Sequence, residues 1–386
     1  MARRGATTAR TSAPTSADVA RLAGVSRATI SLVLNGRASK VRISDGTRDK
    51  VFSAAAQLGY TPNHAARSLR QRRTQIITFV LPTLDNPYFS DVVRAAQTAA
   101  QQHGYVVSVI PAKSRPGAFH ALSFLQGAAF DGIIVAGREN CTAAELSELA
   151  ARGVAVVVLQ ERSPDPAIRS VSVDLEAGGY MATRHLIDLG HRRIAHVTER
   201  LHEPGTRWDR IDGYCRALAE ADIAFDPSLV RTAENTMAGA SLAIGHLIDS
   251  GPLRPTAAFM YNDQMAVGAL HAARARGLAV PGDFAVVGFD GVAIGQFTAP
   301  TLTTIDHPRE ELGRLAIEAL IDAIEKRPPA VREHLLPVRL VVRESCGGGS
   351  KSAAAGFGRE PDAGPTRPQK AEQPSKPDPT EPRRKP

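Results

Sequence analysis

The sequence lacks the marks of an exported or membrane-spanning protein. None of its apolar runs approaches the roughly 18 residues that a membrane span needs. The N-terminal stretch MARRGATTARTSAPTSA has no apolar segment after its arginines, so it does not resemble a secretory signal. Cysteine is scarce, and Cys141, Cys215 and Cys346 stand far apart without a CxxC pattern. We therefore expect a soluble cytoplasmic protein with reduced thiols and no membrane partner.

Motifs of catalysis and cofactor binding are missing too. His191, His196 and His202 have no metal-binding spacing, and nothing indicates a Ser-His-Asp arrangement. No GxGxxG sequence or Walker loop follows a strand-like run. We therefore expect no catalytic residue, no metal and no cofactor, and an enzyme is the weaker of the function classes considered.

Charge is unevenly distributed along the chain. Residues 1–73 carry 14 Lys and Arg against 3 Asp and Glu, a net charge of +11. Residues 74–346 carry 25 against 31 (−6) and residues 347–386 carry 8 against 5 (+3), which together give the overall +8. A cationic N-terminal segment joined to an acidic body is typical of a nucleic-acid-binding head on a globular regulator. A basic solvated surface is the alternative interpretation.

Both ends of the chain are predicted to be disordered tails. Residues 1–13 are rich in Arg, Ala, Thr and Ser. Residues 347–386 contain eight prolines, no Leu, Ile or Val, and one aromatic residue, Phe357. Neither segment can bury enough apolar surface to offset the entropy lost on folding. The C-terminal segment also lacks heptads, so we predict no coiled-coil tetramer.

Two short helical patterns stand close together in DVARLAGVSRATISLVLNG, from Asp18 to Gly36. Gly24 can end the first helix and Ser26 can cap the second. Such a pair is either part of a helical bundle or a helix-turn-helix, whose second helix enters the DNA major groove. The cationic setting favours the helix-turn-helix. The apolar stripes of the two helices are Val19, Ala20, Leu22 and Ala23, and then Ile30, Val33 and Leu34.

A different pattern begins at Thr74. The apolar runs QIITFVLP, YVVSVIP, DGIIVAG and GVAVVVLQ alternate with helical stretches at 88–103 and 142–152. The runs RRIAHVTE, TAAFMYND and DFAVVGFDG then alternate with helical stretches near 177–189, 207–221, 237–250 and 263–276. Apolar strands that alternate with helices predict two doubly wound parallel sheets, with ligands at the carboxyl ends of the strands.

The motifs, taken in order, resemble those of one family. DVARLAGVSRATISLVLNG is followed by TRDKVFSAAAQLGYTPNHAARSLR, NPYF, DGIIV, HLIDLGHRRIAHV, WDRIDGY, YNDQMAVGAL, VVGFDG and LTTI. This series, from about Thr15 to Arg343, resembles the lactose-repressor (LacI/GalR) family of bacterial transcriptional regulators. The resemblance implies an all-α helix-turn-helix DNA-binding head and an α/β two-lobed core similar to periplasmic binding proteins. It also implies a ligand-responsive repressor that binds double-stranded operator DNA as a homodimer.

The resemblance divides the chain into five parts. These are a basic tail (1–13), a DNA-binding domain (14–61), a hinge helix with a linker (62–73), an effector-binding core (74–346) and a second tail (347–386). Within the core, lobe 1 is expected at about 74–173 and 303–333, and lobe 2 at about 174–302 and 334–346. An effector bound between the lobes would alter the pairing of hinge helices on the operator. A sugar-transport protein would share this core, but it would need an export signal and no DNA head.

The resemblance places DNA contacts around the recognition helix and in the hinge. Arg27, Ala28 and Leu32 would face outward, and Arg27 would reach either a base or a phosphate. Leu69 would wedge into the minor groove, although a basic linker is the alternative interpretation of this segment. The expected DNA contacts are Thr15, Ser26, Arg27, Ala28, Thr29, Ser31, Leu32, Asn35, Asn63, Ala66 and Leu69.

Two positions depart from the family pattern. Leu32 stands where the family most often has Arg, so we expect no guanine preference at the matching operator position. The turn between Asn35 and Ser44 is about three residues longer than the family pattern. Its Arg37, Lys40 and Arg42 either contact phosphates or stay solvated.

The resemblance also implies an effector site. Tyr88 and Phe89 of NPYF would form an aromatic wall, and Arg210 and Asp290 would bind polar groups, with Asn262 or Asp263 beside them. Core aromatics and a structural Arg–Asp pair are the alternative interpretations. The effector class is a sugar, a sugar derivative or a nucleobase. The expected effector contacts are Tyr88, Phe89, Asp174, Trp208, Arg210, Asn262, Asp263 and Asp290.

Overall fold

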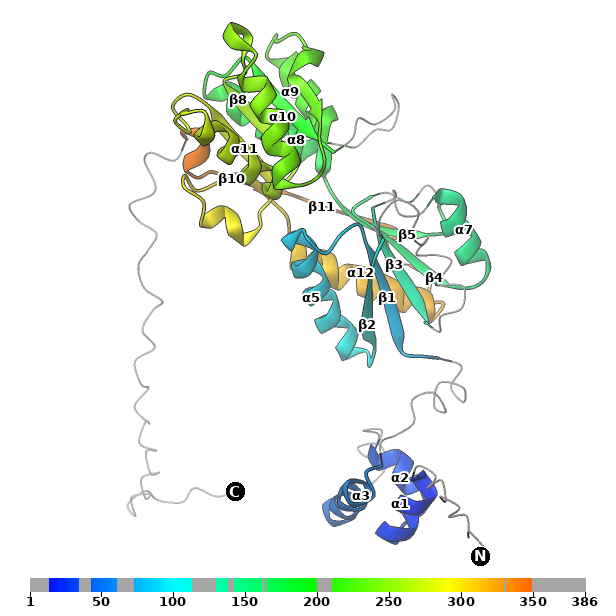
Figure 1. Cartoon of the computed structure of the whole chain (residues 1–386). Coiled ribbons are helices and arrows are strands. Elements are labelled where there is room, and N and C mark those ends of the chain that lie inside the picture. The colour runs from blue at the N-terminus through cyan, green and yellow to red at the C-terminus, as the bar shows by residue number, and fades with distance from the viewer. Residues whose placement is uncertain are drawn as a thin grey trace, which may run out of the picture. The chain divides into compact units, whose positions relative to one another are not determined.

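The computed structural model describes residues 14–34, 43–60, 73–112, 130–137, 142–161, 163, 165–199, 210–329 and 331–348. Its contacts divide the chain into two compact units, one of residues 1–177 and 306–339 and the other of residues 178–305 and 340–386 (Figure 1). The polypeptide therefore passes from one unit to the other three times.

Three helices form the N-terminal head: α1 (Ser16–Ala23), α2 (Arg27–Leu34) and α3 (Asp45–Gln57). A capping box starts α1, because the Thr15 side chain accepts the N–H of Asp18 and the Asp18 carboxylate accepts the N–H of Thr15. Gly24 ends α1 with a φ of 64°, which glycine adopts without strain. The Ser26 hydroxyl accepts the N–H of Thr29 at 3.1 Å. The predicted turn chemistry is thus confirmed.

The head encloses one small apolar core. Val19, Ile30, Val33 and Val51 are all buried in it, which confirms the inward side of α2. The prediction for Leu22 was wrong, since this side chain is 47% exposed. At 3.6 residues per turn, Leu22 lies about 110° around the helix from the centre of the arc made by the other apolar positions. A head of three short helices covers only that arc.

In the first unit, six strands form one sheet in the order β11-β5-β4-β3-β1-β2, and all neighbouring pairs are parallel. Its strands are β1 (Ile76–Leu81), β2 (Val106–Pro111), β3 (Gly132–Ala136), β4 (Ala155–Leu159), β5 (Arg169–Val173) and β11 (Glu333–Leu336). Its helices are α5 (Pro87–Gln102), α7 (Ala143–Ala151) and α12 (Arg309–Ile324).

Helices cover both faces of this sheet (Figure 1). Leu146 of α7 packs with Ile133 and Val135, which point to one face of β3. On the other face, a Cβ added to Gly132 would lie only 3.0 Å from Leu320 of α12. The apolar strands β1, β3 and β4 are therefore buried on both sides, as the sequence predicted, whereas the edge strand β2 leaves Val106 exposed.

The second unit repeats this plan. Its six strands, in the order β12-β10-β9-β8-β6-β7, are β6 (Ile194–Thr198), β7 (Val230–Thr232), β8 (Ala257–Met260), β9 (Ala285–Asp290), β10 (Thr303–Asp306) and β12 (Arg339–Val341). The pairs β6–β7, β6–β8 and β8–β9 are parallel. Its helices are α8 (Leu175–Asp188), α9 (Arg210–Glu220), α10 (Met237–Ile248) and α11 (Asp263–Ala275).

The two faces of the second sheet bury different kinds of side chain. Aliphatic residues such as Val197 and Val286 pack beneath α10 and α11. On the opposite face the His196 ring stacks on Phe259 at 4.8 Å and on Tyr214 of α9 at 5.4 Å. His196 is therefore a core residue.

The predicted fold class is confirmed, but the lobe boundaries need correction. Residues 303–305 belong to the second unit, because they form β10 of its sheet. Residues 334–336 belong to the first unit, because their strand β11 pairs with β5 in the register Leu336↔Val173, and residues 337–339 group with it. Residues 174–177 also group with the first unit. Across the described ranges, no helix combines the length and hydropathy that a membrane crossing requires.

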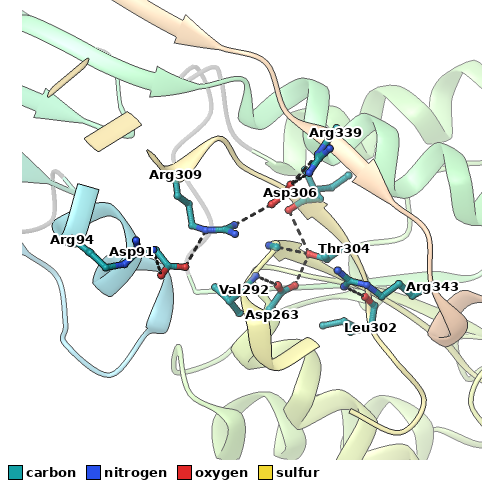
Figure 2. Close-up of polar contacts among 12 residues, drawn as sticks. Asp91, Arg94, Asp263, Val292, Leu302, Thr304, Asp306, Arg309, Arg339 and Arg343 are labelled. Carbon is teal, nitrogen blue, oxygen red and sulfur yellow. Dashed lines mark hydrogen bonds and ion pairs between the residues drawn. The ribbon is translucent and has the colours of Figure 1, made fainter. Parts of the chain in front are cut away.

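An ion-pair network lies at two of the three crossings, among residues of the first unit (Figure 2). Arg309, at the start of α12, contacts Asp91 at 3.2 Å and Asp306 at 3.1 Å. Arg339 donates two hydrogen bonds to Asp306, at 2.7 and 2.9 Å. The network thus ties the two crossing segments to α5.

Candidate functional site

The recognition helix α2 exposes a short polar face. Arg27, Ala28 and Ser31 are exposed, whereas Thr29 and Leu32 are half-buried. The hydroxyl groups of Ser26 and Thr29 lie 2.9 Å apart at its N-terminus. The predicted outward orientation of Arg27 and Ala28 is confirmed, and Leu32 is less accessible than they are.

Several predicted site residues lie outside the described residues. They include the loop at 35–42, the hinge at 61–72 and most of the two tails. The individual residues concerned are Asn35, Asn63, Ala66, Leu69 and Trp208.

The predicted aromatic wall of the first unit is buried at the start of α5. Asn86 caps this helix by accepting the N–H of Tyr88 at 3.0 Å. The Tyr88 ring meets Phe89 and His307 edge-on, with centroids 5.3 Å apart in each case. Asp174, at the end of β5, accepts the N–H of Ala177 at 2.9 Å and so caps α8.

Arg210, the first residue of α9, contacts two aromatic rings of the second unit. Its guanidinium carbon lies 4.3 Å from the Tyr261 ring centroid and 4.2 Å from that of Phe289, and the residue is 6% exposed. Cation–π attraction is strong for such a desolvated guanidinium. Tyr261 and Phe289 directly precede Asn262 and Asp290, so the start of α9 lies against the carboxyl ends of β8 and β9.

Asn262 belongs to a chain of polar side chains along the same sheet edge. Its carbonyl oxygen accepts the N–H of Met265 at 2.8 Å, which caps α11. Its amide donates to Asn235 at 2.7 Å, and Asn235 donates to Glu199 at 3.2 Å. Sequence reasoning missed Asn235 and Glu199, although both follow strands, β7 and β6.

Asp263 forms hydrogen bonds inside the second unit (Figure 2). It is fully buried, and its two carboxylate oxygens accept the Val292 N–H at 2.8 Å and the Thr304 hydroxyl at 2.5 Å. Burial, reinforced by the neighbouring Asp290 carboxylate, raises the pKa of Asp263 to about 8. Within the described residues, no group of three or more His, Cys, Asp or Glu side chains is arranged to hold a metal.

A cavity of about 560 Å³ opens at the amino ends of β4 and β5, which is the opposite edge from the predicted effector residues. Arg169 lines it, but its guanidinium donates to the carbonyls of Ala319 and Arg327. This side chain therefore ties the end of α12 to β5, and we assign the cavity no ligand.

A helix-turn-helix head followed by two α/β units with polar side chains at the strand ends defines a bacterial transcriptional regulator with a binding-protein-like core. Residues 15–63 match the model of the bacterial regulatory proteins of the lacI family, and residues 183–346 match that of the periplasmic binding protein-like domain. The chain belongs to the LacI family.

Curated relatives and solved structures agree with this assignment. The ribose operon repressor of Haemophilus influenzae is 33% identical over 332 residues, 85% of this chain and 97% of the relative. The regulator DegA of Bacillus subtilis is 32% identical over 331 residues, 85% of this chain and 96% of the relative. The lac repressor dimer bound to operator and the anti-inducer ONPF has a TM-score of 0.71, with 30% identity over 86% of this chain and 99% of that one. The CelR–cellobiose complex has a TM-score of 0.62 at the same identity and coverage.

Proposed function

We propose that this chain is an effector-responsive repressor that binds operator DNA as a homodimer in the cytoplasm. The family assignment and the exposed face of α2 support DNA binding. The contacts proposed are those of the recognition helix and, outside the described residues, those of the hinge. The effector acts by favouring one of two conformations of the core, which changes the pairing of the hinge helices on the operator.

The setting of Arg210 carries the effector part of this proposal. Its guanidinium lies against the rings of Tyr261 and Phe289, which directly precede Asn262 and Asp290 at the carboxyl ends of β8 and β9. A cationic donor and a carboxylate at the same edge of a sheet suit a ligand with several hydroxyl or ring-nitrogen groups. We infer a sugar, a sugar derivative or a nucleobase. Tyr88, Phe89, Asp174 and Trp208 remain proposed contacts from the family resemblance.

A thermal-shift panel of D-ribose, cellobiose, adenosine and cytidine tests this effector class. A compound that binds the folded core raises its melting temperature Tm. The Arg210→Gln variant should lose the shift, whereas Arg216→Gln, an exposed arginine on the same helix, should keep it. An unaltered shift in Arg210→Gln would remove Arg210 from the site. Consumption of the compound would contradict a binding function without turnover.

Sedimentation tests the proposed assembly. A chain that stays monomeric at the concentration at which it binds operator DNA would contradict the homodimer, since two-fold related half-sites require two heads.

A further inference from the structure

Asp290 has an unusual backbone conformation. Its φ is 112° at the last position of β9, in the range that residues with a Cβ rarely adopt. Gly291 follows with a φ of 69°, which glycine adopts freely. Strain of this kind persists only where the surrounding structure over-determines the backbone, and it is often found at ligand sites.

Two buried side chains hold the residues that follow Asp290 (Figure 2). The Val292 N–H donates to Oδ2 of Asp263 at 2.8 Å, and the Gly291 N–H donates to the Thr304 hydroxyl oxygen at 3.3 Å. The same Thr304 hydroxyl donates to Oδ1 of Asp263 at 2.5 Å. Both side chains are fully buried, so each hydrogen bond is sheltered from water.

The Asp263 carboxyl group is itself fixed in place. It lies at the first position of α11, and the preceding Asn262 caps that helix. A Cβ added to Gly288 of β9 would fall 2.2 Å from its Oδ1, so the carboxyl group packs directly against the strand backbone. A rigid helix end thus carries the acceptor for the Val292 N–H.

We propose that Asp263 and Thr304 are positioning residues of the effector site, which clamp the Gly291–Val292 turn and thereby hold Asp290 in its strained conformation. The effector part of this inference rests on the proposed function, in which Asp290 contacts the ligand. Asp263 then acts through the backbone and does not touch the effector.

The hydroxyl of Thr304 suits either protonation state of Asp263. It donates to the ionised carboxylate, and it can accept from the protonated acid while turning its own proton to the carbonyl of Ile305, 3.4 Å away. An asparagine at this position has the same pattern as the protonated acid. Its carbonyl accepts the Val292 N–H, and its amide donates to Thr304.

Two replacements of Asp290 measure its backbone strain in the absence of any ligand. A glycine variant is ordinarily less stable than the matching alanine variant, because glycine loses more backbone entropy on folding. At a φ of 112° glycine is unstrained and alanine is not, so Asp290→Gly should have a melting temperature about 2 to 4 °C above that of Asp290→Ala. Equal melting temperatures, or the reverse order, would mean that the backbone stores no strain here and would overturn the proposal.

The clamp is then tested by removing one hydroxyl. In a Thr304→Val background the chain can relax, so the advantage of Asp290→Gly over Asp290→Ala should shrink by at least half. Thr303→Val is the matched control, because Thr303 is a buried residue of the same strand whose hydroxyl binds Cys346 and the Arg343 N–H. This control should leave the full advantage. An equal effect of the two valine variants would contradict a specific clamp.

Variants of Asp263 complete the test. Asp263→Asn should keep the glycine advantage, and Asp263→Ala should lose it; loss in both would show that hydrogen bonding by this side chain does not hold the turn. For any panel compound that stabilises the natural chain, Thr304→Val should lower its affinity at least tenfold and Thr303→Val less than twofold. If no panel compound binds, the proposed effector class fails, while the comparison at Asp290 still decides whether the clamp exists.

Discussion

Individual residues at the strand ends divide into two groups by what they contact. Asp174, Asn262 and Asp263 accept backbone N–H groups, so their first effect is to fix helix starts and a turn. Arg210, at the start of α9, contacts the rings of Tyr261 and Phe289 through its guanidinium. A residue of the first group can matter to ligand binding by placing a residue of the second group.

The raised pKa of Asp263 makes stability depend on pH. Because its pKa rises from 3.8 to about 8 on folding, the folded chain holds a proton that the unfolded chain releases. The free energy of unfolding should therefore fall between pH 6 and pH 8, by up to about 1.4 kcal/mol per pH unit. Denaturant titrations of the natural chain and of Asp263→Asn measure this, and the variant should lack the fall.

Asp249→Asn is the control for this pH prediction. Asp249 is exposed on the same unit, and its pKa is lowered by the hydrogen bond from Arg276, so it stays ionised over this range. The control should keep the slope of the natural chain. Identical slopes in the natural chain and Asp263→Asn would show that another group titrates.

Among the elements, the head is where sequence patterns were most informative. Gly24 defines the turn by its positive φ and Ser26 by a hydrogen bond from the Thr29 N–H. Both depend only on neighbouring residues and not on the rest of the fold. The starts of α10 and α11 matched the predicted starts at Met237 and Asp263 for the same reason, since Thr236 and Asn262 cap them.

Features made by contacts between distant segments were not predictable. The aromatic setting of Arg210 joins α9 to the ends of β8 and β9, and the Asp263–Thr304 bond spans 41 residues. The exposure of Leu22 and the short strands β5, β7, β10, β11 and β12 likewise depend on what packs beside them. Periodicity carries no signal for such pairings.

The capping box at the start of α1 should stabilise the head. Thr15→Ala removes the hydroxyl half of the capping box, which accepts the Asp18 N–H, and should destabilise the head by about 0.5–2 kcal/mol. Ser44→Ala is the matched control, because Ser44 stands at the N-cap of α3 but makes no side-chain cap hydrogen bond. Hydrogen exchange of the α1 amides in the full chain measures the difference. Equal protection in both variants would contradict a stabilising cap.

The half-buried Leu32 of α2 should influence which operator sequence the head prefers. Leu32→Arg should shift the preferred half-site toward guanine at one position, by about 1–3 kcal/mol, if a bidentate pair forms. Binding-site selection with both chains measures the shift. A strong guanine requirement in the natural chain at the position facing Leu32, or no shift in the variant, would mean that α2 is aligned differently on DNA.

For the whole molecule, the ion-pair network at the crossings should matter more than surface pairs. Arg309→Met leaves Asp91 and the half-buried Asp306 with one cation fewer, and should cost about 1–3 kcal/mol of unfolding free energy. Arg314→Met, on the same helix, breaks only surface pairs with Glu311 and Glu318 and should cost about 0–1 kcal/mol. Equal losses in denaturant titrations would contradict this ranking.

The three crossings between units also constrain how the chain folds during synthesis. Helix α12 and strand β11 of the first unit come from residues 309–336. Strands β10 and β12 of the second sheet come from residues 303–306 and 339–341. The ribosome therefore releases a finished three-helix head long before either sheet has its last strands. Nascent chains halted near residue 300 would carry a folded head beside two open sheet edges, a state prone to aggregation until the last fifth of the chain emerges.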